Sequence, residues 1–298
     1  MSYSKLKSKK IVCVIQEESN SAHLQSLNNN LTVTKGETAS SIPFHRIQCV
    51  LIFGNCSITS PFIRESIKNN ITVSIFDYFG YLITSISASS HNPDLKTFQY
   101  ASKNNHNIAT KIIEAKLLNQ CNILKKRSNI ELLIPNLDSV STIEELLGYE
   151  GSYASQYYEN LFTDIGWVRR QPRVKADIPN VLLDMGYMRL YSITESLVTQ
   201  FGFDPYKGFL HKDYYSRKSL VCDFMEPFRP IVDGYLLSMY NLGQVREQDF
   251  IVKNQKYQFV DSKTYHRYSI LFIKHLSKEI EKIYDFISDM KGYITNNN

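Results

Sequence analysis

The chain has 298 residues, a formal net charge of +5 and a hydrophobic content of 43%. This length can bury a sizeable core in one or two domains, and the mild positive charge is compatible with a polyanionic partner without defining one. The five cysteines are scattered and form no C-x-x-C pair, which argues against a disulfide framework or a zinc cluster and favours reduced thiols in a cytosol. The apolar run at 11–15 is too short for a signal-peptide core, and no run is long enough to span a membrane. We therefore expect a cytoplasmic protein without membrane contact.

Residues 1–90 predict a small β-rich domain. Ser60 followed by Pro61 is typical of a helix start, which predicts a short helix over 61–69 within this region. The expected strands are the β-prone runs Lys10–Ile15, Thr32–Thr34, Val50–Phe53, Ile71–Phe76 and Leu82–Ser87.

The pattern changes at a small, polar segment, 87–94, which contains Pro93 and is typical of a linker. From Phe98 onward, apolar residues recur with helical spacing instead of strand spacing. We place the linker at 91–97. The sequence thus predicts an α+β fold, with a small β-rich N-terminal domain (1–90) followed by a larger, mostly α-helical catalytic domain (98–298).

A helix is predicted to open where Ser141 and Glu144 have the spacing of a capping box. This helix carries Glu150 between Gly148 and Gly151. The small neighbours would permit close approach by another chain segment or a phosphate, although a lone glutamate on a helix is usually solvated.

Residues 163–179 predict a basic loop. Four positive charges lie within seven residues, next to the single tryptophan, Trp167. They are Arg169, Arg170, Arg173 and Lys175. Base stacking or phosphate neutralisation by this loop, and an exposed loop without a partner, are equally compatible with the pattern.

Toward the C-terminus, Asp249–Lys253 and Lys256–Val260 predict a short hairpin. A final amphipathic helix is expected over 264–290. We expect its two histidines, His266 and His275, at the surface and without a role.

The stretch Gly208–Asp233 carries the strongest candidates for chemistry. His211 lies on a predicted loop, and Asp223 and Glu226 are three residues apart on the predicted helix that follows, so that both carboxylates would lie on one face. An imidazole with carboxylates suits a divalent cation, Mg²⁺ or Mn²⁺. The alternative is a solvated acidic face beside a hydrogen-bonded histidine. The apolar flanks favour the site, because acids set in an apolar surface need a partner or a metal.

The same stretch resembles a known family. His211, followed by Ser-Leu-Val-Cys-Asp-Phe-Met-Glu-Pro-Phe-Arg-Pro, is similar to the signature of the CRISPR-associated integrase, the universal catalytic subunit of spacer acquisition. The resemblance covers nearly the whole chain in order. Its other motifs lie at Leu51–Gly54, Ile71–Gly80, Gly148–Tyr158 and Asn180–Tyr187.

This resemblance implies that Glu150, His211 and Glu226 are metal ligands, with Mg²⁺ or Mn²⁺ as the cofactor, and that Asp223 is an accessory catalytic acid. It implies an N-terminal domain that forms a homodimer and contacts a small partner subunit. The implied activity is that of a metal-dependent DNA endonuclease and integrase of CRISPR adaptation. Such an enzyme joins the 3′-hydroxyls of a short DNA fragment, the protospacer, to the CRISPR repeat by phosphodiester transesterification.

Two main classes of function stay open from the sequence. The intact set of two glutamates and one histidine favours the enzyme, and the absence of a nucleophile motif such as G-x-S-x-G agrees with attack by a DNA hydroxyl. The alternative is a catalytically weak DNA-binding structural subunit of the adaptation complex; an unrelated metal-dependent phosphodiesterase is a distant third. Residues expected to contact double-stranded DNA are Arg169, Arg170, Arg173, Lys212 and Arg217, and for those beside His211 a solvated surface is an equally good interpretation.

Overall fold

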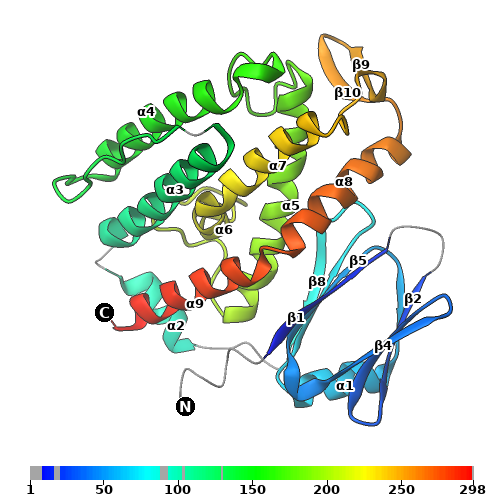
Figure 1. Cartoon of the computed structure of the whole chain (residues 1–298). Coiled ribbons are helices and arrows are strands. Elements are labelled where there is room, and N and C mark those ends of the chain that lie inside the picture. Colours follow the sequence, from blue (N-terminus) through cyan, green and yellow to red (C-terminus); the bar gives the residue numbers. More distant parts are fainter. Residues whose placement is uncertain (1–8, 17–20, 88–92, 103–104, 129, 297–298) are drawn as a thin grey trace.

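A computed structural model of the chain describes residues 9–16, 21–87, 93–102, 105–128 and 130–296. The strands of residues 10–86 gather on one side and the long helices on the other, with a short hairpin at 250–259 beside the helices (Figure 1). The expected α+β architecture, with a β-rich N-terminal part followed by a mostly helical part, is confirmed. None of the helices in the described ranges is long and apolar enough to cross a membrane.

The first sheet has the strand order β1-β5-β7-β8. Strands β1, β5 and β7 run parallel, and β8 is antiparallel to β7. All four strands were predicted from their apolar runs. They span β1 Lys10–Ile15, β5 Ile47–Phe53, β7 Thr72–Phe76 and β8 Leu82–Ile86.

The second sheet has the order β4-β3-β2-β6 and was largely missed by the sequence prediction. Of its strands, only β3 was predicted, and that one in part. The others were missed because they lack a run of apolar residues; β4, for example, has the sequence Thr-Ala-Ser-Ser-Ile-Pro. Helix α1 (Ser60–Lys68) follows this sheet, capped by Thr59, one residue before the expected Ser60. The strands are β2 Ala22–Leu27, β3 Asn30–Lys35, β4 Thr38–Pro43 and β6 Cys56–Ile58.

Strand β5 divides its side chains between two hydrophobic cores. Successive residues of a strand point to opposite faces of the sheet. Leu51 and Phe53 therefore join the core shared with the helices, whereas Val50 and Ile52 join the core closed by α1 and the second sheet. A strand buried on both faces reads as a continuous apolar run, which is why it was easily predicted.

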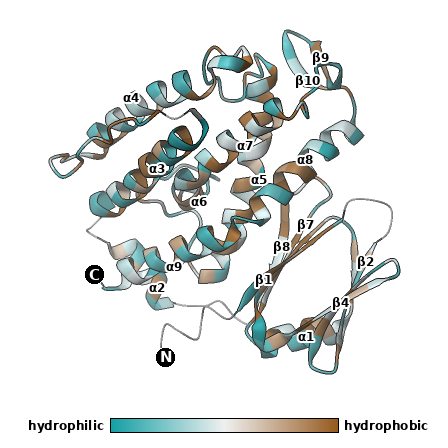
Figure 2. Cartoon of the chain, in the orientation of Figure 1, coloured by the Kyte–Doolittle hydropathy of each residue, from teal (hydrophilic) through white to brown (hydrophobic). Residues whose placement is uncertain are grey.

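Helix α5 (Ile178–Phe201) is the centre of the helical part. It contacts α6, α7, α8 and α9 as well as strand β8, and it is buried around most of its circumference. Hydrophobic residues concentrate where the helices meet the first sheet (Figure 2). The other helices are α2 Pro93–Ala101, α3 Asn105–Ser128, α4 Ile143–Leu161, α6 Ser219–Met225, α7 Arg229–Asn241, α8 Ser262–Ser277 and α9 Ile280–Asn296.

Several boundaries differ from the prediction. Positions 91 and 92 of the predicted linker lie outside the described residues, and 93–97 form the first turns of α2 instead of a linker. The single C-terminal helix expected over 264–290 is two helices, because the helix is interrupted between Ser277 and Ile280. The predicted hairpin is confirmed as β9 (Phe250–Lys253) and β10 (Lys256–Phe259).

His266 is buried, so its expected surface position is wrong. Its ring stacks on Tyr78 with centroids 3.4 Å apart, and its Nδ1 lies 2.9 Å from the Tyr78 carbonyl oxygen. Ser269 donates a hydrogen bond of 2.7 Å to the carbonyl of Phe79. Helix α8 thereby holds the turn between β7 and β8 against the helical part. His275 is half-buried and stacks on Tyr235.

The helix crossing around α5 generates a stability prediction. A Cβ on Gly186 would clash with Val232 of α7 and lie 2.8 Å from Phe272 of α8. We expect Gly186→Ala to lower the free energy of unfolding by about 1–3 kcal/mol, because overpacked cores shift at a cost. Urea denaturation measures the change.

The matched control is Gly148→Ala on α4. Gly148 and Gly151 were predicted to permit close approach by another chain segment or a phosphate, and a Cβ at either meets no protein atom within 4 Å. Alanine at Gly148 should therefore raise the free energy of unfolding by up to about 1 kcal/mol through helix propensity. Equal destabilisation of both variants would contradict the close packing assigned to Gly186.

Candidate functional site

Glu150 is presented by α4, whose first turn is closed by a capping box. Thr142 accepts a hydrogen bond from the backbone N–H of Glu145 at 3.2 Å, and the Glu145 side chain accepts one from the Thr142 backbone, also at 3.2 Å. The box predicted at Ser141 and Glu144 is therefore wrong by one residue. The helix start itself was correctly predicted.

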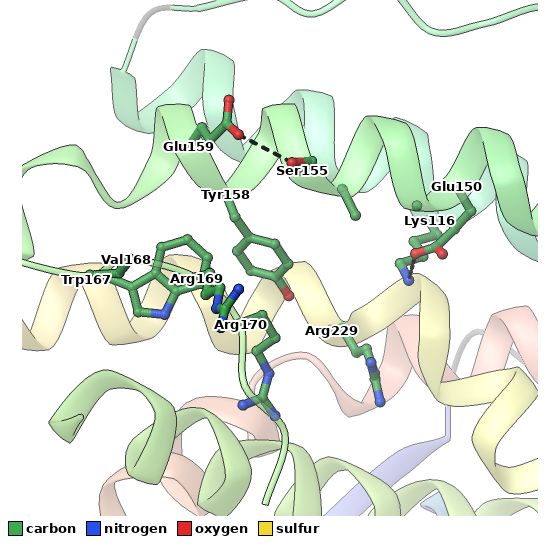
Figure 3. A pocket seen from close by; sticks show the side chains of 12 residues that line it. Lys116, Glu150, Ser155, Tyr158, Glu159, Trp167, Val168, Arg169, Arg170 and Arg229 are labelled. Carbon is green, nitrogen blue, oxygen red and sulfur yellow. Dashed lines mark hydrogen bonds and ion pairs between the residues drawn. The ribbon is translucent and has the colours of Figure 1, made fainter. Parts of the chain in front are cut away.

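The carboxylate of Glu150 meets a lysine that was not predicted from the sequence. Lys116, on α3, forms an ion pair with Glu150 (Figure 3) and donates a hydrogen bond of 2.6 Å to Oε2 of Glu226. The Lys116, Glu150 and Glu226 side chains are only 9%, 19% and 7% exposed. One ammonium group thus lies between two carboxylates that come from different parts of the helical domain.

Glu226 follows α6 directly, in a short 3₁₀ turn that leads into α7. Its second oxygen, Oε1, lies 3.3 Å from Nε of Arg229. Burial alone would raise the pKa of Glu226, but the charges of Arg229 and Lys116 outweigh it and lower the pKa to about 2. Glu226 is therefore an anion at neutral pH, held between two cations.

Asp223 is fully buried and organises the loop that carries His211. Its Oδ2 accepts hydrogen bonds from the backbone N–H groups of Phe209 and Leu210, at 2.6 and 3.0 Å. Its Oδ1 accepts one from the His211 N–H at 3.0 Å and lies 2.6 Å from Nδ1 of the ring. A ring nitrogen that donates to a carboxylate fixes the tautomer, which leaves Nε2 as the nitrogen available to a ligand.

The two acids of the sequence motif therefore do not converge on one spot, contrary to the expectation. Asp223 uses its oxygens on the loop of His211, whereas Glu226 turns toward Lys116 and Glu150. The reason is that α6 ends at Met225 and the chain tightens into a 3₁₀ turn at Glu226. The pair of carboxylates that does converge is Glu150 with Glu226.

The donor types fit a divalent cation. Two carboxylates already share a cation, the Lys116 ammonium, and oxygen with imidazole donors suits Mg²⁺ or Mn²⁺. Among the described residues, no three acidic, histidine or cysteine side chains form a ready coordination shell. Glu150, Glu226 and His211 thus fit a metal by chemistry, while the position between the carboxylates is taken by the lysine.

A cavity of about 370 Å³ opens beside Glu150, between α4 and the segment 167–170 (Figure 3). Arg169, Arg170 and Arg229 line it together with Lys116 and Glu150. Clustered guanidinium groups in a cavity are suited to bind phosphate.

Arg170 is held by its neighbours within this cavity. It forms an ion pair of 2.5 Å with Asp184 and donates a hydrogen bond of 2.9 Å to Asn180. Trp167, at the other end of the cavity, packs against Tyr158 and Phe162 with centroids 5.3 and 5.4 Å apart. The tryptophan is thus partly committed to packing, and base stacking by it stays a prediction.

A larger cleft of about 1380 Å³ passes His211 and Glu226. Its walls combine aromatic and basic side chains, a composition suited to single-stranded nucleic acid. The predicted DNA-binding residues Arg170, Arg173 and Arg217 line it, whereas Lys212 is 89% exposed and lies 3.4 Å from Glu144. The aromatic lining includes Phe79, Tyr81, Tyr187, Tyr191, Tyr214, Tyr215, Phe259 and Tyr265.

A buried polar network lies behind Arg229 and was not predicted. Asp233 accepts hydrogen bonds from the hydroxyls of Tyr187 and Tyr157, and the Arg229 guanidinium lies 4.7 Å from the Tyr187 ring centroid. Burial raises the pKa of Asp233 to about 6, although both hydroxyls and Arg229 act in the opposite direction. The network fixes Tyr187 and thereby the ring on which Arg229 rests.

Lys116 and Asp233 were missed for a common reason. Each is a single charged residue on a helix that no motif singles out, although Asp233 ends the stretch 208–233, and a lone helical charge is usually solvated. The available signal was that Lys116 lies within the apolar face of α3, between Ile113 and Leu117. A charge on an apolar face requires a buried partner.

Comparison with known proteins identifies the family of the chain. The model of the family "CRISPR associated protein Cas1" matches residues 15–270. "CRISPR-associated protein Cas1 3" of Methanobrevibacter ruminantium is 30% identical, over 76% of this chain and 77% of the relative. "CRISPR-associated endonuclease Cas1 1" of Archaeoglobus fulgidus is 27% identical, over 79% of this chain and 81% of that protein.

Solved structures share the fold. A chain of a partial Cas6-RT-Cas1–Cas2 complex superposes with a TM-score of 0.80 at 21% identity, covering 97% of this chain and 96% of the other. A casposase bound to integration product gives a TM-score of 0.70 at 24% identity, with coverage of 97% and 96%. These neighbours share the fold of the chain, in which a β-rich N-terminal part is followed by a mostly helical part. The chain belongs to the CRISPR-associated Cas1 family.

The role of Asp223 generates a prediction. We expect Asp223→Asn to lower the free energy of unfolding by about 1–3 kcal/mol, because an amide NH₂ would face backbone donors that then lack an acceptor. Amide hydrogen exchange should also speed up at residues 209–211. Thermal or urea denaturation with exchange measurements checks both.

The matched control is Asp213→Asn on the same loop. Asp213 is 50% exposed, pairs with Lys207 at 2.8 Å and accepts a single backbone hydrogen bond, of 3.2 Å from Gly208, where Asp223 accepts three. Surface pairs contribute at most about 1 kcal/mol. If the two variants were equally stable, Asp223 would not be the residue that organises the loop.

Proposed function

We propose that this protein is a metal-dependent DNA integrase and endonuclease of CRISPR adaptation. It joins the 3′-hydroxyls of a protospacer to the CRISPR repeat by transesterification. The observation that carries the proposal is the convergence of Glu150 and Glu226 on one shared cation, beside arginines suited to phosphate. The names of the relatives support it, since they include endonucleases and a casposase bound to its integration product.

In this proposal Glu150, Glu226 and His211 hold Mg²⁺ or Mn²⁺. When bound, such an ion polarises a phosphodiester and lowers the pKa of an attacking hydroxyl. Asp223 keeps the His211 ring in the tautomer that presents Nε2, so Asp223 is a positioning residue. In this proposal it has no direct catalytic role, although one was expected from the sequence; Glu150, His211 and Glu226 keep theirs.

The remaining residues act on the DNA backbone. Arg170 and Arg229 lie at 5.3 and 4.7 Å from the Tyr187 ring centroid and face the same cavity. They bind the phosphates next to the reacting bond and oppose the charge that develops there. The attacking group is a DNA hydroxyl, so no protein nucleophile is needed.

The partners follow from the same proposal. Double-stranded DNA, as protospacer and repeat, occupies the basic surface, and the protein acts as a homodimer with a small partner subunit. Solved neighbours described as a Cas1–Cas2 complex and as a complex of TtCas1 with DNA support both kinds of partner.

The test of function is strand transfer of a labelled duplex into supercoiled plasmid. We expect joining with Mg²⁺ or Mn²⁺, none with EDTA, and a loss of about 100-fold or more in His211→Ala and Glu226→Ala, because each removes a metal ligand. His45→Ala, at an exposed position of the N-terminal part, is the control. DNA binding without joining under any metal, with the partner subunit present, would instead establish the DNA-binding structural subunit.

A separate prediction concerns the basic loop. The affinity for duplex DNA should fall steeply with salt, since phosphate contacts release counterions. Arg173→Ala, in an exposed residue that lines the cleft, should reduce the slope of log affinity against log salt by about 1. Lys68→Ala, 61% exposed on α1, should leave the slope unchanged. The same slope in Arg173→Ala and wild type would remove this loop from the DNA interface.

A further inference from the structure

Lys116 occupies the position that a bridging metal ion would need. Its ammonium is within hydrogen-bond distance of both Glu226 Oε2 and Glu150 Oε1. A divalent ion held by the same two carboxylates would need the same gap between their oxygens. The two cations therefore exclude each other at this position.

The charges of the cluster already cancel. Glu150 and Glu226 contribute two negative charges, and Lys116 and Arg229, each paired with one or both of them, contribute two positive charges. A divalent ion added to these four side chains without any rearrangement would leave two uncompensated positive charges among them in a largely buried site. The Asp233 carboxylate behind Arg229 offsets only one of these charges, so the addition is unfavourable. Binding of the ion is thus linked to departure of a resident charge.

Lys116 is the residue able to leave. It also lines the cavity of Figure 3, so its flexible four-carbon stem has space into which the ammonium can turn. Arg229, by contrast, rests on the Tyr187 ring, which Asp233 holds in place.

We propose that Lys116 is a resident counter-ion of the acidic site, which holds Glu150 and Glu226 together in the metal-free protein and competes with the divalent ion for them. This inference rests on the metal site proposed above. In the metal-free state Lys116 stabilises the fold by neutralising the carboxylates. On metal binding it turns into the cavity, where its charge faces the phosphate of bound DNA. The site therefore binds metal weakly until the lysine is displaced.

The experiment is calorimetric titration of Mn²⁺ into metal-free protein without DNA. We expect Lys116→Met to bind Mn²⁺ about tenfold or more tightly than wild type, because the competing charge next to the ion is removed. Lys126→Met, which removes an exposed charge from the last turn of the same helix, should match wild type. Glu226→Gln should abolish binding at this site.

Thermal unfolding provides a second readout that does not depend on activity. In EDTA, Lys116→Met should melt below wild type, because two buried carboxylates are left unneutralised, and Mn²⁺ should raise its melting temperature more than that of wild type. If Lys116→Met does not fold in EDTA, Lys116→Gln, which keeps a hydrogen-bond donor without the charge, takes its place in both measurements.

The outcomes separate the two proposals. In one outcome, wild type binds Mn²⁺ through Glu226, but Lys116→Met and Lys116→Gln bind it no more tightly than wild type does. That result would overturn the counter-ion role and leave the metal site intact. Wild type and both lysine variants that behave like Glu226→Gln would overturn the metal site, and the counter-ion role with it.

Discussion

Two ionised carboxylates that lie side by side in a protein interior repel each other unless a positive charge neutralises them, and Lys116 supplies that charge between Glu150 and Glu226. The three residues come from α3, α4 and the turn after α6, so the two ion pairs of Lys116 tie together three separate stretches of the helical part. Asn119, one turn further along α3, adds a hydrogen bond of 2.7 Å to the carbonyl of Pro227. The geometry of the site therefore depends on the packing of these helices.

The motif around α6 divides its acids between two tasks. Asp223 faces backward and satisfies three consecutive backbone N–H groups, which shapes the loop from Phe209 to His211 before any ligand is present. Glu226 turns toward Lys116 and lines the larger cleft, because the helix tightens into a 3₁₀ turn there. A buried carboxylate that accepts several backbone hydrogen bonds is well stabilised, so the loop is built on an anion that costs little to keep buried.

The surroundings of the site are graded from structural to exposed. Behind the site, Asp233 and the two tyrosines that donate to it form a buried network. Arg170 and Arg229 pack on the Tyr187 ring and face the cavity. Arg173 and Arg217 lie farther out and line the open cleft. Cations positioned by aromatic rings lose less conformational freedom on binding phosphate than free side chains do. Arg170 and Arg229 are positioned in this way by the Tyr187 ring against which they pack.

Much of the fold was open to prediction because its signals are local. The apolar runs of β1, β5 and β7, the change to helical spacing after the linker region, and the turn between β9 and β10 each depend on a few neighbouring residues. The second sheet was missed because strands such as β4 gain their pairing from neighbours and not from their own composition. The division of the C-terminal helix into α8 and α9 likewise has no strong breaker in the sequence.

For the site, the sequence by itself determined which residues are candidates: Glu150, His211, Asp223 and Glu226 were all named from residue type, spacing and family resemblance. Only the tertiary structure decided which of them meet. It paired Glu226 with Glu150, which lies 76 positions earlier in the sequence, and brought Lys116 between the two carboxylates. It also assigned Asp223 to the loop that carries His211. The physical reason is that partners of a buried charge are selected by helix packing across long sequence separations, and no local pattern records that selection.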